Sequence, residues 1–408
     1  MTSNRVTIDQ LGAGGDGIAE TETGAVYVPF TLPGEEATVA RSGNRASLVA
    51  LLKRSPERVE ATCRHFESCG GCALQHLKAE SYRGWKRTLV VEALRARGLD
   101  CDVAELVSCR PETRRRAVFA VAPGGALIGF NKAMSHDIVG IEECPVLVPA
   151  ITARLSSLGR IARLLGTGHK PFRLSVTATA SGLDLAATGC GKFSDKARRL
   201  LTEAVLAEDF ARLSVDGEII VEPKKPVIFF GRVPVTPPPG GFLQASAEAE
   251  EAMAAAVCEH LAKSKRVADL FAGAGAFALR LAERSAVHAV EGDASALAAL
   301  DRAAREAHGL KPVTVERRDL ARRPLLPKEL KAYDGLVFDP PRAGAEEVVR
   351  QLAKAEVARV AAVSCNPGTL ARDLAILVAG GYRLTKVVPI DQFLWSPHVE
   401  AVALMEKR

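Results

Sequence analysis

Two motifs in the last third of the chain carry side chains that can do covalent and acid–base chemistry. Cys365 stands in a Ser-Cys-Asn-Pro sequence directly after the apolar run 357–363, and Asp339 begins an Asp-Pro-Pro-Arg sequence directly after the run 336–338. Two buried parallel strands would bring this thiol and this carboxylate to the same carboxyl edge of one sheet, where open α/β folds bind ligands. Because a cysteine followed by Asn-Pro lies in a turn, we interpret Cys365 as a nucleophile rather than as a small buried hydrophobic residue.

A regular alternation of strand and helix patterns surrounds these motifs, after the proline- and glycine-rich stretch 233–241. Strands are predicted at 266–271, 287–292, 313–318, 334–338 and 358–363. With helices between them, these strands predict an α/β fold with a doubly wound, Rossmann-like parallel sheet. The ranges 386–390 and 399–405 follow as a terminal antiparallel pair, and a helix is predicted earlier, at 82–97.

The first predicted strand of this sheet ends in a glycine-rich turn at 269–275. Glycines there let the backbone turn tightly and approach a ligand closely. The next strand ends at Glu291, whose carboxylate could accept both hydroxyls of a ribose. A nicotinamide site needs a third glycine, but Ala278 stands at that position. Together with the Asp-Pro-Pro-Arg motif, this absence favours S-adenosylmethionine (AdoMet) as the cofactor.

A cluster of cysteines indicates a second site. Three of them have C-x5-C-x2-C spacing: Cys63, Cys69 and Cys72. Thiols this close, with two glycines between the last two, are typical of metal ligation. We expect Cys144 as the fourth ligand, because a Cys-Pro turn resembles those around iron–sulfur clusters, with Cys101 and Cys109 as alternatives. Zinc would take the same thiolates, so the spacing alone leaves the metal open.

The length and composition of the chain limit the class of protein to which it can belong. A chain of 408 residues is too long for one ordinary core, so two or three domains are expected. It has neither a long apolar run nor an apolar stretch typical of a secretory signal, so we expect a cytoplasmic protein with reduced cysteines. The positive charge lies mainly in residues 111–240, with 17 Lys and Arg against 12 Asp and Glu, and this basic bias suits an RNA partner.

With these motifs assembled, the chain resembles the RNA uracil-5-methyltransferases, and among them the branch that acts on 23S ribosomal RNA. The segments 15–17, 28–30 and 32–35 look like a TRAM domain, an OB-type RNA-binding barrel. The run 69–76 and the Cys-Pro-Val at Cys144 are similar to the family's motif for a 4Fe-4S iron–sulfur cluster. The resemblance implies three domains: a TRAM-like β-barrel at 1–54, an α+β domain with the cluster at 55–235, and an AdoMet-dependent methyltransferase domain at 236–408.

The resemblance is closest in the last third. Phe242-Leu243-Gln244 looks like the family's Phe-x-Gln cofactor motif. The AdoMet-binding residues that the family pattern implies are Gln244, Phe271, Gly273, Glu291, Asp319 and Asp339. Cys365 matches the nucleophile, and Glu400 in His-Val-Glu matches the general base. The chain departs from the pattern at Ala276, where many members carry a polar residue.

The implied function is AdoMet-dependent methylation of uridine C5 in RNA, most of all 23S ribosomal RNA, through a covalent bond between Cys365 and C6. We expect a monomer without membrane or DNA partners, which flips the target base out of the stack. The alternatives are a transfer RNA uracil-5-methyltransferase, a non-catalytic RNA-binding assembly factor, an iron–sulfur redox or radical enzyme, and an exocyclic-amine methyltransferase. The last class carries an aromatic residue where Arg342 stands.

Overall fold

The N-terminal residues alternate short apolar strands with glycine turns, and these strands pair in one sheet. The computed structural model describes residues 3–166, 168, 170–191 and 194–407, so residues 1, 2, 167, 169, 192, 193 and 408 of the expected domains lie outside it. The strands are β1 (Ser3–Thr7), β2 (Gln10–Leu11), β3 (Gly17–Thr21), β4 (Gly24–Val28), β5 (Glu36–Ser42) and β6 (Arg45–Lys53). Their order is β1-β5-β6-β4-β3-β2, around a core that includes Val26, Val28 and Val39. Closure of this sheet into a barrel stays a prediction.

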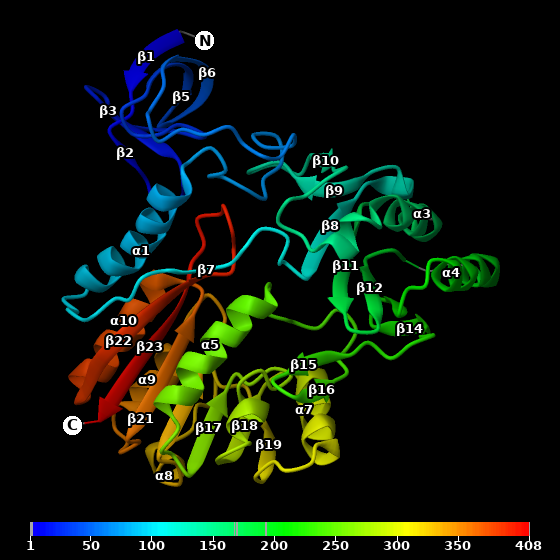
Figure 1. Ribbon diagram of the computed structural model, residues 1–408, viewed down its shortest axis with the longest axis vertical. Coiled ribbons are helices and arrows are strands. Elements are labelled where there is room, and N and C mark those ends of the chain that lie inside the picture. Colours follow the sequence, from blue (N-terminus) through cyan, green and yellow to red (C-terminus); the bar gives the residue numbers. More distant parts are fainter. Residues whose placement is uncertain (1–2, 167, 169, 192–193, 408) are drawn as a thin grey trace.

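A second sheet occupies the middle of the chain (Figure 1). Its strands are β8 (Arg116–Val121), β9 (Ile128–Asn131), β10 (Ile138–Gly140), β11 (Phe172–Thr179), β12 (Gly182–Thr188), β13 (Arg212–Val215) and β14 (Glu218–Val221). The short helices η1 (Pro123–Gly125) and α2 (Pro149–Thr152) and the longer α3 (Leu155–Leu165) and α4 (Asp195–Ala207) accompany it. Apolar residues of α3 at helical spacing, Leu158, Ile161 and Leu165, join the core of this sheet. The hairpin β15 (Ile228–Phe230) and β16 (Val233–Val235) leads to the last part of the chain.

The C-terminal sheet confirms the predicted alternation of strands and helices. Its strands are β17 (Arg266–Leu270), β18 (Ala286–Glu291), β19 (Val313–Arg317), β20 (Gly335–Phe338), β21 (Arg359–Ser364), β22 (Tyr382–Asp391), β23 (Glu400–Lys407) and the short β7 (Val107–Ser108). The order is β19-β18-β17-β20-β21-β23-β22-β7. Strands β17 to β21 pair in parallel, β23 lies antiparallel between β21 and β22, and β7 adds to β22 in parallel. The sheet is therefore mixed, with the predicted terminal pair inside it.

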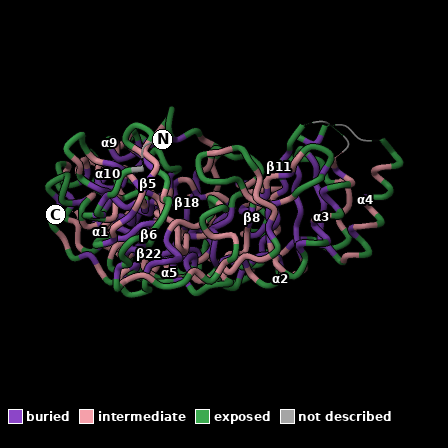
Figure 2. The backbone as a smooth tube through the Cα atoms, turned by 90° about the horizontal axis from the view of Figure 1, so that it is seen from above, coloured by how far each residue is buried: buried purple, intermediate pink, exposed green. Residues whose placement is uncertain are grey.

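Helices cover both faces of this sheet because its central strands are apolar at successive positions. The helices are α5 (Ala247–His260), α6 (Ala278–Leu281), α7 (Ala294–Glu306), α8 (Pro327–Leu330), α9 (Glu346–Leu352) and α10 (Pro367–Ala379). In β20, Leu336 and Phe338 pack in the core that contains α9 and α10, whereas Val337 packs in the core that contains α5. Side chains alternate across a strand, so burial on both faces requires such an unbroken apolar run. Buried residues gather both here and in the central sheet (Figure 2).

Helix α1 (Ala79–Arg95) precedes the central sheet in the chain but packs on the C-terminal one. It begins three residues before the predicted helix. Its Val90 and Leu94 lie in the core with α9 and α10. This segment falls in the expected domain 55–235, whereas its packing joins it to the C-terminal sheet. Among the described residues, no helix has the length and apolarity needed to cross a membrane.

A buried ion pair fastens α1 to residues 392–399, which we call the β22–β23 loop. Lys86 and Asp391 are both fully buried and form a salt bridge. The Lys86 ammonium also donates to the carbonyl oxygens of Phe393, at 2.9 Å, and His398, at 2.7 Å. The Tyr82 hydroxyl donates to Asp391 at 2.8 Å. One helix thus fixes both ends of a loop that is more than 300 residues distant in sequence.

We predict that Lys86→Met destabilises the protein by about 3–5 kcal/mol, because it leaves the Asp391 carboxylate buried without its counter-ion. Denaturation followed by fluorescence tests this, since the two tryptophans of the chain, Trp85 and Trp395, lie in one apolar cluster at this contact. Lys78→Met is the control, because Lys78 forms a half-exposed pair with Glu57 and should change stability by less than about 1 kcal/mol. Equal effects of the two substitutions would contradict the role of the buried pair.

Candidate active site

A cavity of about 460 Å³ opens at the carboxyl edge of the C-terminal sheet. The predicted site residues that line it are Gln244, Phe271, Gly273, Glu291, Asp339, Cys365 and Glu400. Asp319 is absent from the described lining. Its carboxylate accepts instead from the backbone N–H of Ala321, at 3.1 Å, in a turn where the side chain is 52% exposed. The cavity therefore gathers the predicted residues from β17, β18, β20, β21 and β23, and leaves Asp319 outside.

The glycine-rich turn after β17 forms one wall of this cavity. Phe271, Gly273 and Gly275 have φ angles of 61°, 54° and 103°, and for Phe271 that backbone conformation is strained. A Cβ on Gly275 would lie 2.9 Å from the Leu300 Cγ of α7, so glycine is required for close packing as well. Because neither glycine carries a side chain, a ligand in the cavity can lie close to the backbone of this turn.

Glu291 is held rigidly beside this turn. Its carboxylate accepts from the backbone N–H groups of Gly273, at 2.9 Å, and Asp293, at 2.8 Å. Asp293 in turn caps α7 by accepting from the N–H groups of Ser295 and Ala296. A carboxylate fixed in this way at the end of the second strand can accept hydrogen bonds from the hydroxyls of a ribose.

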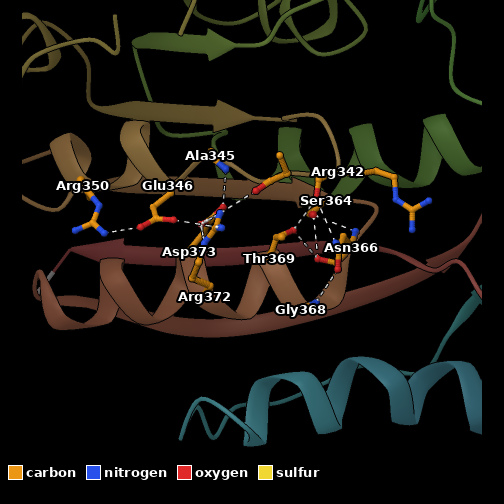
Figure 3. Close-up of polar contacts among 11 residues, drawn as sticks. Arg342, Ala345, Glu346, Arg350, Ser364, Asn366, Gly368, Thr369, Arg372 and Asp373 are labelled. Carbon is orange, nitrogen blue, oxygen red and sulfur yellow. Dashed lines mark hydrogen bonds and ion pairs between the residues drawn. The ribbon is translucent and has the colours of Figure 1, made fainter. Parts of the chain in front are cut away.

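The turn that carries Cys365 is tied to the turn that follows Asp339. Asn366 begins α10 and accepts from the Gly368 N–H at 3.0 Å, while its own amide donates to the Arg342 carbonyl at 3.2 Å. The Thr369 hydroxyl donates to the same carbonyl at 3.3 Å. Figure 3 shows these contacts between the two turns. They fix the position of the thiol relative to the neighbouring carboxyl.

Two carboxyls face this thiol across the cavity. Burial raises the pKa of Glu400, and the charge of Asp339 raises it further. Burial likewise raises the pKa of Asp339, against a hydrogen bond of 2.9 Å from the Gln244 amide. Burial, followed by the charges of Glu400 and Asp339, raises the pKa of Cys365 to about 11, against the attraction of Arg342. The thiol is therefore protonated at neutral pH, and both carboxyls can take up protons near neutrality.

Gln392 also lines the cavity, and sequence reasoning missed it. Its amide donates to Gln244 at 2.8 Å and to the Glu400 carboxylate. The predicted antiparallel pair carried a usable signal. Since Ile390 pairs with Glu400 in that hairpin, the residue two positions after Ile390 must lie close to the same carboxyl.

The predicted metal ligands line a second cavity, of about 220 Å³: Cys63, Cys69, Cys72 and Cys144. A Cβ on Gly70 would lie 2.7 Å from the Ala133 backbone nitrogen, so the chain between Cys69 and Cys72 can pass this turn only with glycine. Within the described residues, no three His, Cys, Asp or Glu side chains stand in metal-binding geometry. The four thiols thus share one cavity without converging on a point. As a donor set of thiols alone, they fit an iron–sulfur cluster or zinc.

The alternative fourth ligands lie elsewhere. Cys101 lines a separate hollow beside Arg87 and Arg95. Cys109 is buried in the core that contains α5. Of the three cysteines weighed for the fourth position, Cys144 is the one that lines the cavity of the other thiols.

Comparisons with known proteins agree with this geometry. The family model for tRNA (uracil-5-)-methyltransferase matches residues 237–408. An uncharacterized RNA methyltransferase of Brucella suis is 64% identical over 412 residues, which cover 100% of this chain and 99% of that protein. The 23S rRNA (uracil(1939)-C(5))-methyltransferase RlmD of Pseudomonas entomophila is 36% identical over 431 residues, which cover 98% of this chain and 93% of that protein.

A solved structure shares the fold over the whole chain. It is the Pyrococcus abyssi tRNA (uracil-54, C5)-methyltransferase in complex with S-adenosyl-L-homocysteine, with a TM-score of 0.78 and 24% identity. The match covers 98% of this chain and 99% of that one. It supports an α/β methyltransferase fold for the C-terminal sheet.

We predict that Cys365 titrates far above an ordinary thiol, with a midpoint near pH 11. The rate of alkylation by iodoacetamide, followed by mass spectrometry of the peptide that contains Cys365, measures this titration. Glu400→Gln should lower the midpoint, because it removes a negative charge that opposes the thiolate. A midpoint at the ordinary value of about 8.5 in the unsubstituted protein would contradict the prediction.

Proposed function

Because the chain belongs to the RNA uracil-5-methyltransferase family, we propose that it methylates C5 of a uridine in 23S ribosomal RNA through a covalent adduct with Cys365. The observation that carries the proposal is the meeting of the Cys365 thiol and the Glu400 carboxyl in one cavity with the cofactor-binding turn. The ribosomal substrate is supported by the relative from Pseudomonas entomophila, which is similar over nearly the whole chain. The runner-up is a transfer RNA substrate, which the name of the matching family model suggests.

In the proposed mechanism, Cys365 loses its proton to solvent and attacks C6 of the flipped uracil. The C6–S bond forms while the 5,6 double bond breaks, and its electron pair moves through C5 towards O4. AdoMet supplies an electrophilic methyl group when bound, so C5 can become methylated as the methyl–sulfur bond breaks. Glu400 then takes the proton from C5, the double bond re-forms, and the Cys365 thiolate leaves C6. Atoms and charge balance, with the C5 proton on Glu400.

The cofactor would bind where the glycine turn and two carboxyls meet. We propose that Glu291 accepts from the ribose hydroxyls, while Phe271, Gly273, Gln244 and Asp339 line the rest of the cofactor's site. Each of these residues lines the cavity. A cofactor contact of Asp319 stays part of the proposal, although its carboxylate accepts from the Ala321 N–H in an exposed turn and it does not line the cavity.

We propose that the four cysteines around the smaller cavity hold a 4Fe-4S cluster. Support comes from the donor set, which consists of thiols alone, and from the way the cavity joins Cys144 to the distant segment that contains the other three. A cluster there would cross-link two segments of the chain whose nearest ligands, Cys72 and Cys144, are 72 residues apart in sequence. Such a cross-link would stabilise the fold. We also propose the domain limits 1–54, 55–235 and 236–408, with the N-terminal sheet as an RNA-binding TRAM domain and with α1 and β7 of the middle range packed on the C-terminal sheet.

We predict that Glu400→Gln traps a covalent protein–RNA adduct, whereas Cys365→Ala forms none. Removal of the base blocks the release of the thiolate after methylation, and removal of the thiol blocks the first bond. Incubation with AdoMet and 23S ribosomal RNA transcribed in vitro, followed by denaturing electrophoresis, measures the adduct. Normal turnover by Cys365→Ala would end the nucleophile assignment.

The same assay separates the two substrates. Methylation of ribosomal RNA well above that of transfer RNA is expected. Equal rates on the two RNAs would refute the ribosomal assignment and leave the chemistry standing.

We predict that the protein purified without oxygen is brown and holds about four irons per chain. Cys144→Ala should lose iron and lower the unfolding temperature, because cluster binding is coupled to folding. Cys258→Ala is the matched control, since Cys258 lines a different groove on α5 and should keep its iron. Stoichiometric zinc without iron would refute the cluster, and full iron in Cys144→Ala would refute that ligand.

A further inference from the structure

We propose that Gln392 is a positioning residue for the removal of the C5 proton that follows methyl transfer: its amide holds Glu400 as a hydrogen-bond acceptor and links it, through Gln244, to Asp339. The inference rests on the proposed role of Glu400 as the base. The family resemblance assigns no role to Gln392, and no motif in the sequence predicts one. The network of hydrogen bonds around this amide carries the argument.

The orientation of the Gln392 amide is fixed by the backbone. Gln392 is 3% exposed, and its Oε1 accepts from the Ala245 N–H at 3.0 Å. A backbone N–H can only donate, so the flipped amide would set two donors against each other in a buried site. The NH₂ group of Gln392 must therefore face the cavity.

Both hydrogens of this NH₂ group have partners. One is donated to Gln244 Oε1 at 2.8 Å, and the other to the Glu400 carboxylate. Because Gln244 accepts through its oxygen, its own NH₂ group points to Asp339, to which it donates at 2.9 Å. The Ala245 N–H thus orients the two amides so that each carboxyl accepts a hydrogen bond from an NH₂ group.

An amide donor favours the ionised form of a carboxyl, which is the form a base needs. Burial and the charge of Asp339 raise the pKa of Glu400, whereas the hydrogen bond from Gln392 lowers it. Among the described residues, the other charged or titratable groups that line the cavity are Cys365, Arg342, Glu250, Glu291 and Asp293, and His398 lies beside Arg342. Gln392 therefore opposes the groups that would keep Glu400 protonated.

The fold holds Gln392 in place from its other side. Adjacent side chains of an extended chain point in opposite directions, so Asp391 points to α1 while Gln392 points into the cavity. The Asp391 carboxylate is fixed by the buried Lys86 and by the Tyr82 hydroxyl. The position of the amide is thus set before any ligand binds.

The test is the pH dependence of the single-turnover release of methylated 23S ribosomal RNA from the covalent adduct with Gln392→Met, which keeps the length of the side chain and removes its donors. Loss of the donor raises the pKa of Glu400, so the acidic limb of the profile should move up by about one pH unit. The rate at neutral pH should fall about tenfold and recover towards the unsubstituted rate in alkali. Tyr382→Phe is the control on β22, the strand that ends just before Gln392, because Tyr382 is buried at the far end of that strand from the cavity, and it should leave the profile unchanged.

Gln392→Glu is the second variant, and it decides the matter where Gln392→Met does not fold. It keeps an acceptor for the Ala245 N–H but adds a carboxyl beside Glu400, so its acidic limb should move further than that of Gln392→Met. A rate that falls equally at every pH, or a loss confined to AdoMet affinity, would overturn the proposal. If Glu400→Gln traps the adduct while the profile of Gln392→Met is unmoved, the positioning role fails and the proposed function stands. If Glu400→Gln turns over normally, the proposed base fails first.

Discussion

The cost of burying charge governs this active site. Asp339, Glu400 and Cys365 all line one largely apolar cavity, where burial disfavours the charged form and raises the pKa of each group. Their negative charges also oppose one another, so full ionisation of all three is unfavourable in the free protein. The compensation comes from neutral amides, since Gln244 and Gln392 supply donors to the carboxyls without adding a counter-charge. The Ala245 N–H and the hydrogen bond between the two amides hold them in this orientation.

The β22–β23 loop connects the active cavity to the rest of the fold. Its first residue, Gln392, belongs to the active cavity, whereas Leu394 and Ser396 line the cavity of the four cysteines. The carbonyl of Trp395 accepts from the backbone N–H groups of Ala73 and Leu74, directly after Cys72. In Figure 1 this red loop rises from the C-terminal sheet towards the blue and cyan segments. The loop therefore contributes residues to both cavities. Its contacts with α1 help to hold that helix on the C-terminal sheet, whose parallel strands begin almost 200 residues later in the chain.

Sequence reasoning reached the features that are local and failed on those that depend on distant pairing. The parallel strands β17 to β21 were predictable because each is a short apolar run between helices, and their ends bring Asp339 and Cys365 together. The position of α1 was not predictable, because no local pattern tells which of two sheets its apolar face will cover. Gln392 has an ordinary amide side chain, whose role depends on the backbone of Ala245 about 150 residues away. For Asp319 the motif position predicts a contact with the cofactor, and the residue lies in an exposed turn outside the lining of the cavity, so that contact stays a prediction.

The raised pKa of Cys365 bears on how the proposed chemistry can begin. A thiol with a pKa of about 11 has little thiolate at neutral pH, so Cys365 is mostly protonated, and therefore a weak nucleophile, in the free site. The opposing charges of Glu400 and Asp339 are part of the cause, and protonation of either carboxyl eases the ionisation of the thiol. We propose that a pyrimidine whose O4 accepts a hydrogen bond from a protonated carboxyl is a better acceptor at C6. The same protonated carboxyl no longer opposes the loss of the Cys365 proton to solvent. Activation then depends on the substrate being seated, which restricts the reactive form of Cys365 to the complex in which it is useful.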